Sequence, residues 1–340
     1  MKPFNDKIVK NDLETLHKEV ATDEFVGKRF LITGGAGFLG SWLCDFLIGA
    51  DGMVECVDDL STGMNVNIDH LTNQKKFQFR KLDVTQTNLT GIHYDAILHL
   101  ASHASPDEYQ KHPIETLAVN SHGTQNLLEL ARENDAIFFY SSTSEVYGDP
   151  TMIPTPESYW GNVSSIGPRS CYDEGKRFSE ALCMAYHRTY GLDVRMIRIF
   201  NTYGPRLRSD GFYGRALSRF IDQALSSKEI TVYGDGKQTR SFCYVSDTIR
   251  AILLTLKTSR MKGEVANIGN PNEITILDLA KKVQEITQSN SKITFYPRPI
   301  HDPQRRSPVI TRAREILGWS PSVSLDVGLR KTIEWFRLKK

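Results

Sequence analysis

The sequence predicts an α/β fold in which a doubly wound parallel sheet of the Rossmann type is joined to a smaller C-terminal lobe. Two observations carry this prediction. From Arg29 the run RFLIT is apolar and β-capable, the glycine turn GGAGFLG follows it, and apolar residues then recur at helical spacing. Further short apolar runs alternate with helical segments along the chain, which is typical of parallel strands joined by crossover helices.

The expected elements succeed one another after residue 28. Strands are expected at 29–33, 53–57, 77–82, 96–100, 137–140, 194–199 and 265–269, the last returning to the main sheet. Helices are expected after the glycine turn, near 112–133 and near 174–190. Residues 1–27 are polar, and the spacing of Leu13, Leu16 and Val20 predicts an accessory helix there.

Proline and glycine punctuate shorter elements after about residue 204, which indicates a second, smaller unit. A chain of 340 residues is long enough for it, since single cores stop growing at about 250–300 residues. We therefore expect an N-terminal extension (1–27), a Rossmann domain (28–203, with 236–270 returning to it) and a lobe made of 204–235 and 271–340.

Composition excludes several classes of protein. Lys+Arg 42 against Asp+Glu 40 gives a formal net charge of +2, which offers no global field for nucleic acid or an acidic membrane. The five cysteines show no metal-binding spacing, so we expect reduced thiols and no metal site. Residues 1–27 have no apolar signal-peptide core, and no apolar run is long enough to span a membrane. We expect a cytoplasmic protein.

The glycine turn predicts a dinucleotide site. Gly34, Gly37 and Gly40 form G-x-x-G-x-x-G between a strand and a helix, where pyrophosphate can approach the helix N-terminus. The second strand ends at Asp58, eighteen residues after Gly40, where a carboxylate can accept both ribose hydroxyls. That carboxylate would repel a 2′-phosphate, and no Arg or Lys lies between Asp58 and Lys75, so NAD is favoured over NADP.

Two later strand ends belong to the same edge of the predicted sheet. Leu100, Ala101 and Ser102 follow the fourth strand and are placed beside the cofactor by the switch-point rule for open sheets. Asp83 follows the third strand, where it either meets the adenine amino group or closes an ordinary turn.

Tyr172 and Lys176 predict general base catalysis. Their i, i+4 spacing at the start of a helix puts phenol and ammonium on one face, and a cation there is expected to lower the phenol pKa. A tyrosinate can remove a proton from a sugar hydroxyl while hydride leaves to NAD. Ser141, Ser142 and Thr143 at an earlier strand end strengthen this interpretation.

With these residues in view, the chain resembles the extended short-chain dehydrogenase/reductase family from Lys28 to the C-terminus, and within it the UDP-glucuronate decarboxylases. The resemblance rests on SSTSEVYGDP (141–150), YWG (159–161), IGPRSCYDEGKR (166–177), RIFNTYGPR (198–206), TVYGDGKQTRSFCYVSD (231–247), NIGNP (267–271), DPQRR (302–306) and LGWSP (317–321). It implies NAD-dependent decarboxylation of UDP-glucuronate to UDP-xylose through a 4-keto intermediate, with NAD regenerated in the cycle.

The resemblance also implies residue roles. Tyr172 would be the base for the sugar 4-hydroxyl, Lys176 and Thr143 its partners, and Glu145 would act near C5. Ser144 and Arg306 would contact the uronate carboxylate. Further cofactor contacts would come from Phe38, Leu39, Asp59, Thr62, Gly63, Val84, Asn120 and Thr202, and the substrate would be held by Tyr109, Asn201, Arg215, Tyr233, Gln238, Arg240 and Arg306.

Several alternatives stay open at this point. Arg306 suits a surface charge or a phosphate contact as well, and Tyr233 a strand aromatic that packs the lobe. A 4,6-dehydratase of the family generally carries an acid at the place of Ser144, which disfavours dehydration, and Glu145 argues against a 4-epimerase. Epimerisation is the second candidate function. A non-catalytic NAD-sensing protein is a third, disfavoured by Thr143, Tyr172 and Lys176 together.

The chain departs from the family pattern at a few positions, namely His103, Ala118, Val119, Met64 and Val309, so the sugar is the least fixed part of the prediction. His103 suits either a polar contact in the sugar pocket or a loop position. The helices near 112–133 and 174–190 carry more apolar residues than one sheet face needs, among them Leu127, Leu128, Leu130, Phe178 and Leu182, which predicts a homodimer.

Overall fold

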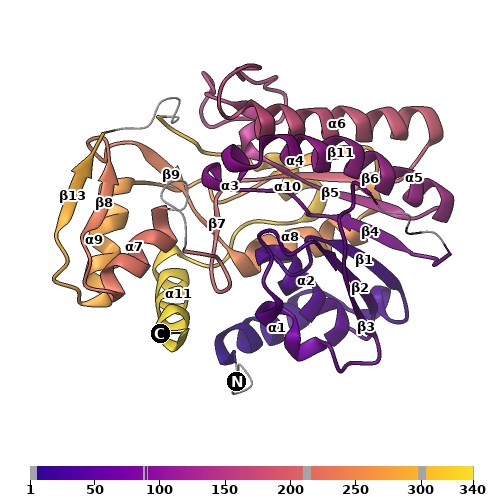
Figure 1. The fold of residues 1–340 in the computed structure, drawn as a ribbon, viewed down its shortest axis with the longest axis horizontal. Coiled ribbons are helices and arrows are strands. Elements are labelled where there is room, and N and C mark those ends of the chain that lie inside the picture. The colour runs from indigo at the N-terminus through magenta and orange to yellow at the C-terminus, as the bar shows by residue number, and fades with distance from the viewer. Residues whose placement is uncertain (1–5, 87–88, 90, 210–215, 298–303, 340) are drawn as a thin grey trace.

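The computed structural model describes residues 6–86, 89, 91–209, 216–297 and 304–339. Its centre is a seven-stranded sheet made of β1 (Arg29–Thr33), β2 (Met53–Asp58), β3 (Phe77–Lys81), β4 (Ala96–His99), β5 (Ile137–Thr143), β6 (Val194–Ile199) and β11 (Glu264–Ile268). All neighbouring strands pair in parallel, in the order β11-β6-β5-β4-β1-β2-β3 (Figure 1). The predicted fold class is confirmed, and each of the seven expected strands lies in this sheet.

Helices cover both faces of the sheet, which is why its strands read as nearly continuous apolar runs. On one face lie α3 (Pro106–Lys111), α4 (Pro113–Ala118), α5 (Thr124–Asn134) and α6 (Ser170–Tyr190). On the other lie α2 (Phe38–Gly49), α8 (Val245–Lys257) and α10 (Thr311–Leu317), as Figure 1 shows. The helix expected near 112–133 is confirmed: α4, a π-helical turn over Val119–Gly123 and α5 follow one another without a gap, and Pro113 is the first helical residue, where a proline is tolerated.

Strand order reverses at β1, which has β2 on one side and β4 on the other. In an open parallel sheet, ligands bind outside the carboxyl ends of the strands at such a switch point. The glycine turn after β1 and residues 100–102 after β4 therefore meet at the same place.

A smaller lobe follows beside the sheet and lies at the left of Figure 1. The parallel pair β8 (Ile230–Tyr233) and β13 (Ile293–Tyr296) is packed by α7 (Ala216–Leu225), α9 (Ile276–Thr287) and α11 (Leu325–Lys339). Two short ribbons join the lobe to the sheet layer. They are β7 (Thr202–Tyr203) with β10 (Cys243–Tyr244), and β9 (Thr239–Ser241) with β12 (Glu273–Thr275).

The N-terminal segment forms the accessory helix that its sequence predicts, α1 (Lys7–Glu19), which packs on α2 and α8. Its Asp12 is buried and accepts a hydrogen bond of 2.7 Å from the Tyr244 hydroxyl, and it pairs with Lys331 on α11. Trp335 on α11 donates its indole N–H to Asp6 at 2.8 Å. Helix α1 thereby ties the sheet layer to the helix that packs the lobe.

All five cysteines are buried free thiols. Within the described ranges, no helix is long and apolar enough to cross a bilayer.

Replacing Asp12 by Ala is expected to lower the free energy of unfolding by about 2–3 kcal/mol, because the Tyr244 hydroxyl and the Lys331 ammonium both lose their partner. Denaturant unfolding measures the change. Asp326→Ala is the control, since its pairs with Arg330 and Lys282 lie at the surface and such exposed pairs contribute little to stability. A change below about 0.5 kcal/mol for Asp12→Ala, the level of ordinary surface substitutions, would contradict the bridging role.

Candidate active site

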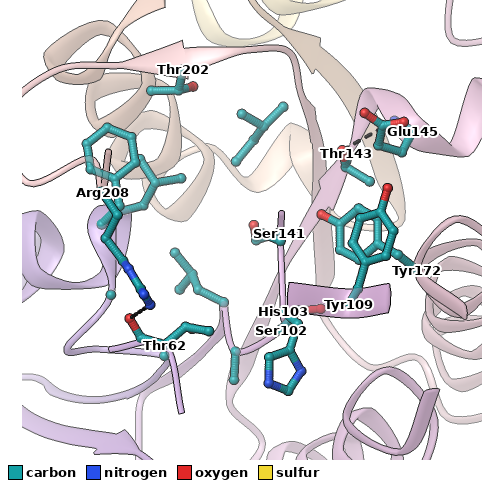
Figure 2. Close-up of a pocket in the computed structure, with 18 of the residues that line it drawn as sticks. Thr62, Ser102, His103, Tyr109, Ser141, Thr143, Glu145, Tyr172, Thr202 and Arg208 are labelled. Atoms are coloured by element: carbon teal, nitrogen blue, oxygen red, sulfur yellow. Dashed lines mark hydrogen bonds between the residues drawn. The ribbon is translucent and has the colours of Figure 1, made fainter. Parts of the chain in front are cut away.

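One cavity of about 690 Å³ lies at the carboxyl ends of the sheet strands, a usual size for a small-molecule site. Its walls come from the glycine turn, from the ends of β2, β4 and β5, from the start of α6 and from the lobe. Figure 2 shows Thr62 and Arg208 on one side of this space and Thr143 and Tyr172 on the other. The cavity thus joins the predicted cofactor residues to the predicted substrate residues.

The glycine turn forms a phosphate-sized cradle. Gly34 has φ of +69°, and a Cβ there would lie 2.8 Å from the backbone nitrogen of Ala101, so only glycine allows β1 and β4 to meet this closely. Gly37 caps α2 without any side-chain hydrogen bond to the first turn, and Gly37, Phe38 and Leu39 line the cavity. The backbone N–H of Gly37 already donates to the Gly34 carbonyl at 3.1 Å, so the N–H groups of Phe38 and Leu39 in the first turn of α2 are the ones that suit an anionic pyrophosphate.

Asp58 ends β2 at the wall of the same cradle. Its carboxylate accepts hydrogen bonds from the backbone nitrogens of Ala36 at 3.0 Å and Leu60 at 2.8 Å, while burial raises its pKa to about 6. A Cβ at Gly63 would lie 2.5 Å from this carboxylate, so a glycine is needed for the loop to pass. The remaining lone pairs fit two ribose hydroxyls, and the residues present fit a dinucleotide without a 2′-phosphate.

Most of the other predicted cofactor residues also line the cavity, namely Asp59, Thr62, Asp83, Val84, Leu100, Ala101, Ser102 and Thr202. Asp83 serves in addition as a turn residue, since its Oδ1 accepts from Thr85 N at 2.9 Å. Gly63 and Asn120 are not among the lining residues. Asn120 is fully buried and donates its amide to the Ser102 hydroxyl at 3.0 Å, so it supports the wall from behind.

The predicted catalytic residues meet at the end of β5. Thr143 closes the strand, and its hydroxyl accepts from the backbone nitrogen of Glu145 at 3.2 Å as the 3₁₀ turn Ser144–Tyr147 begins. Tyr172 on α6 stacks on Tyr109 from α3, with 5.1 Å between ring centres and 5° between planes. Figure 2 shows the two rings lying beneath Thr143 and Glu145 in this view. The buried Tyr109 hydroxyl makes no hydrogen bond with any described residue, so it is free to bind a ligand.

The charge relation between Tyr172 and Lys176 differs from the sequence prediction. Burial raises the pKa of Tyr172 above its usual range, and the charge of Glu145 adds to the rise. Lys176 donates to the Ser141 carbonyl at 2.9 Å and lies 6.0 Å from the Tyr172 ring centre. Burial lowers the pKa of Lys176 itself to about 7, so near neutrality it carries only part of a charge and does not produce the expected lowering.

Four charged side chains form a buried cluster beside these groups. Glu145 accepts from Arg306 through one oxygen and from Arg169 through the other. Burial alone would raise the pKa of Glu145, yet the two guanidinium groups lower it to about 2. Arg169 also faces Asp173, with 3.6 Å between its Nε and Oδ2. Burial raises the pKa of Asp173 to about 7, and the charge of Glu145 acts in the same direction.

Arg169 and Asp173 were missed by the sequence interpretation. Arg169 stands three residues before Tyr172 and four before Asp173, so helical spacing places it one turn from the tyrosine. This spacing could have indicated that Arg169 lies near the site. It is not specific, because many exposed ion pairs on helices have the same spacing.

The predicted substrate residues Asn201, Tyr233, Gln238, Arg240 and Arg306 all line the lobe side of the cavity. Gln238 is buried and donates to the Tyr233 carbonyl at 2.7 Å. Arg219, which the sequence interpretation also missed, lies 5.0 Å from the Tyr233 ring centre. Arg215 lies outside the described residues.

His103 lies in the cavity wall, buried against the Thr116 hydroxyl at 3.2 Å and stacked on His112. Across the cavity, Arg208 donates to the Thr62 carbonyl at 2.9 Å, the contact drawn as a dashed line in Figure 2. The segment after β7 thereby touches the loop that follows β2.

Comparison with known proteins agrees with this geometry. The family model for GDP-mannose 4,6 dehydratase matches residues 31–332. The chain belongs to this family of extended short-chain dehydrogenases/reductases. The resemblance noted in the sequence is therefore confirmed, and the chain is an enzyme of this family.

Individual members are similar over nearly the whole chain. UDP-glucuronic acid decarboxylase 4 of Arabidopsis thaliana is 48% identical over 312 residues, which are 91% of this chain and 68% of the relative. UDP-glucose 4-epimerase of Thermotoga maritima superimposes with a TM-score of 0.84 at 32% identity, covering 92% of this chain and 99% of that one. UDP-glucuronic acid 4-epimerase of Bacillus cereus, solved with UDP-glucuronic acid and NAD, gives 0.81 at 31% identity, covering 92% and 100%.

Proposed function

We propose that this enzyme is an NAD-dependent decarboxylase that converts UDP-glucuronate to UDP-xylose. The observation that carries the proposal is the buried pair of Glu145 with Arg306, placed at the end of β5 in the same cavity as Tyr172 and Lys176. A guanidinium at this place suits a substrate that carries a carboxylate. The decarboxylase activity in the name of the 48%-identical Arabidopsis relative supports the same choice.

In this proposal, different parts of the chain bind the cofactor and the substrate. Residues 28–203, with 236–270, hold NAD through the glycine turn and Asp58. Residues 204–235 and 271–340, together with Gln238 and Arg240 of the returning segment, hold the nucleotide diphosphate, for which the arginines that line the lobe side of the cavity are suited. The contact of Arg208 with Thr62 joins the two sets of residues across the cavity.

The first step is oxidation of the sugar at C4. Bound NAD supplies the chemistry of accepting the C4 hydride and returning it later. Tyr172 accepts the proton of the 4-hydroxyl once its own phenol proton has passed to the neutral amine of Lys176, and Thr143, which hydrogen-bonds the phenol, orients that hydroxyl. Because Lys176 has a pKa near 7, it can exchange a proton at neutral pH as the phenol changes state.

Loss of carbon dioxide follows from the position of the new ketone, which is β to the C6 carboxylate. The electrons of the C5–C6 bond pass into the ketone and leave an enolate, so the step requires no metal. Tyr172 and Thr143 donate to the enolate oxygen. The Arg306 Nε is buried and makes no hydrogen bond with a described residue, so this donor remains for the departing carboxylate. Glu145, which is held ionised, then orders the water that supplies the proton returning to C5.

The exposed apolar surface supports a homodimer. Ile114 and Leu117 on α4 are 72% and 41% exposed, and Phe178 on the adjacent α6 is 51% exposed. We propose that this α4–α6 face pairs with its copy around a two-fold axis. The leucines of α5 do not contribute, because Leu127, Leu128 and Leu130 are buried in the protein's own core.

Tyr172→Phe is expected to reduce turnover at least a hundredfold while NAD stays bound. The phenol contributes proton transfer, whose loss costs about 10²–10⁴ in rate, whereas the glycine turn and Asp58 supply cofactor affinity. Product formation and the NAD content of the purified protein are the two measurements. Turnover within tenfold of the parent enzyme would remove Tyr172 from the mechanism.

The decisive test of the reaction is the mass of the product formed from UDP-glucuronate. Loss of one carbon dioxide supports decarboxylation, whereas an unchanged mass with inverted C4 identifies the epimerase.

Arg306→Ala should weaken UDP-glucuronate binding about thirtyfold or more and leave UDP binding nearly unchanged, because a buried carboxylate loses its charged partner. Glu145→Gln should bind both ligands and stall the cycle with reduced nicotinamide visible by absorbance. Equal weakening of both ligands by Arg306→Ala would make this arginine a phosphate contact.

Phe178→Asp should convert the homodimer to a monomer, because a charge at the centre of the proposed α4–α6 face opposes its own copy. Light scattering at micromolar concentration gives the mass. Val327→Asp on α11, also exposed and apolar, is the control that should stay dimeric. A monomeric parent protein would disprove the interface.

A further inference from the structure

The charge cluster around Glu145 contains more arginine than one carboxylate needs. Arg169 and Arg306 both line the cavity and both pair with Glu145, from opposite oxygens. If Arg306 binds the uronate carboxylate, as the proposed function has it, Glu145 loses one of its two partners. Arg169 is then the group that keeps this buried carboxylate ionised and in place.

Asp173 completes the cluster without touching the cavity. Its side chain is buried, and its Oδ1 accepts no hydrogen bond from any described residue. Its Oδ2 lies 3.6 Å from Arg169 Nε, too far for a strong ion pair. An ionised carboxylate is poorly satisfied in such a place, whereas a protonated one costs little.

We propose that Arg169 and Asp173 select a uronate by charge balance: Arg169 holds Glu145 while Arg306 binds the substrate carboxylate, and Asp173 takes up one proton from the solvent as that carboxylate binds. The inference rests on the proposed function, because it requires a carboxylate on the sugar. Arg169 and Asp173 are positioning residues here, since they act on the substrate through Glu145 and Arg306.

Counting charges supports the proposal. Two guanidinium groups and ionised Glu145 sum to +1 when Asp173 is protonated and to zero when it is ionised. One incoming carboxylate neutralises the first state and leaves the second with an excess negative charge in a buried site. A raised pKa of Asp173, about 7, puts the change between the two states in the physiological range.

The groups that face Asp173 come from three other segments of the chain. Glu145 approaches from the turn after β5, Arg306 from the segment before α10, and Tyr109 from α3. On α6 itself the neighbours are Arg169, Cys171 and Tyr172. Tyr109, Cys171 and Tyr172 have pKa values raised by burial, so among the described residues Glu145 and the two arginines are the charged groups that act on Asp173 near neutrality.

The affinity for UDP-glucuronate is expected to fall as pH rises. The uronate binds the form with protonated Asp173, so its affinity is highest below the pKa of Asp173 and falls as pH rises, by up to about tenfold per pH unit. A neutral sugar of the same nucleotide has no such dependence, because it brings no carboxylate to the cluster.

Isothermal titration of the Tyr172→Phe protein tests this without turnover, using UDP-glucuronate and UDP-glucose from pH 6.5 to 8.5 in buffers of different ionisation enthalpy. We expect UDP-glucuronate to weaken roughly tenfold or more over this range and to take up nearly one proton per site at about pH 8. UDP-glucose should show neither effect.

Adding Asp173→Asn should abolish both the proton uptake and the pH dependence, while Arg169→Gln should weaken UDP-glucuronate at every pH and spare UDP-glucose. Asp193→Asn is the matched control, since Asp193 pairs with Arg195 away from the cavity. Unchanged UDP-glucose binding shows that a variant is folded.

A pH-independent affinity for UDP-glucuronate, or uptake that persists in Asp173→Asn, would overturn the inference. The outcome is separable from the proposed function. Proton-linked uronate binding by an enzyme whose product keeps its carbon dioxide supports the inference and refutes decarboxylation, and decarboxylation with pH-independent binding does the reverse.

Discussion

Parallel pairing of β1 with β4 is the constraint on which the rest of this structure depends. In the all-parallel sheet the carboxyl ends of the seven strands lie at one edge. The loops after β1 and β4 leave that edge in opposite directions, which opens a gap between them. The turn after β1 can enter that gap only because Gly34 lacks a side chain. Asp58, Ser102 and Thr143 then face one cavity because each follows a strand of the same sheet.

Burial governs the electrostatics of this cavity more than pairing does. Asp58, Asp173, Tyr172 and Lys176 are all shifted toward their neutral forms by loss of water. The pKa of Glu145 shifts the other way, because two arginines that lie 24 and 161 residues away in the chain stabilise its ionised form. Asp173 and Lys176, whose pKa values lie near 7, can therefore gain or lose a proton at little energetic cost beside the fixed charges of Glu145 and its two arginines.

Local patterns made the fold and part of the site predictable. Apolar residues marked all seven strands. The inner strands are buried on both faces and need no polar alternation, whereas the edge strand β3 is only partly buried and carries Gln78, Arg80 and Lys81. Asp58 was found because it ends the second strand at the expected spacing after the glycine turn. Tyr172 and Lys176 were found because their i, i+4 spacing places them on one face of a helix. The pairing of Glu145 with Arg306 came only from family resemblance, because a contact across 161 residues has no local signature. The lowered pKa of Lys176 and the burial of the α5 leucines depend on packing, which spacing does not reveal.

Helix α1 has a consequence for motion within the molecule. Through Asp12 it touches both the strand that leads into α8 and the helix that supports the lobe. Opening of the cavity by rotation of the lobe would therefore have to slide or shear α11 along α1, rather than swing freely about the short ribbons. The N-terminal helix thus limits how freely the lobe can rotate, although its partners Tyr244 and Lys331 lie 232 and 319 residues further along the chain.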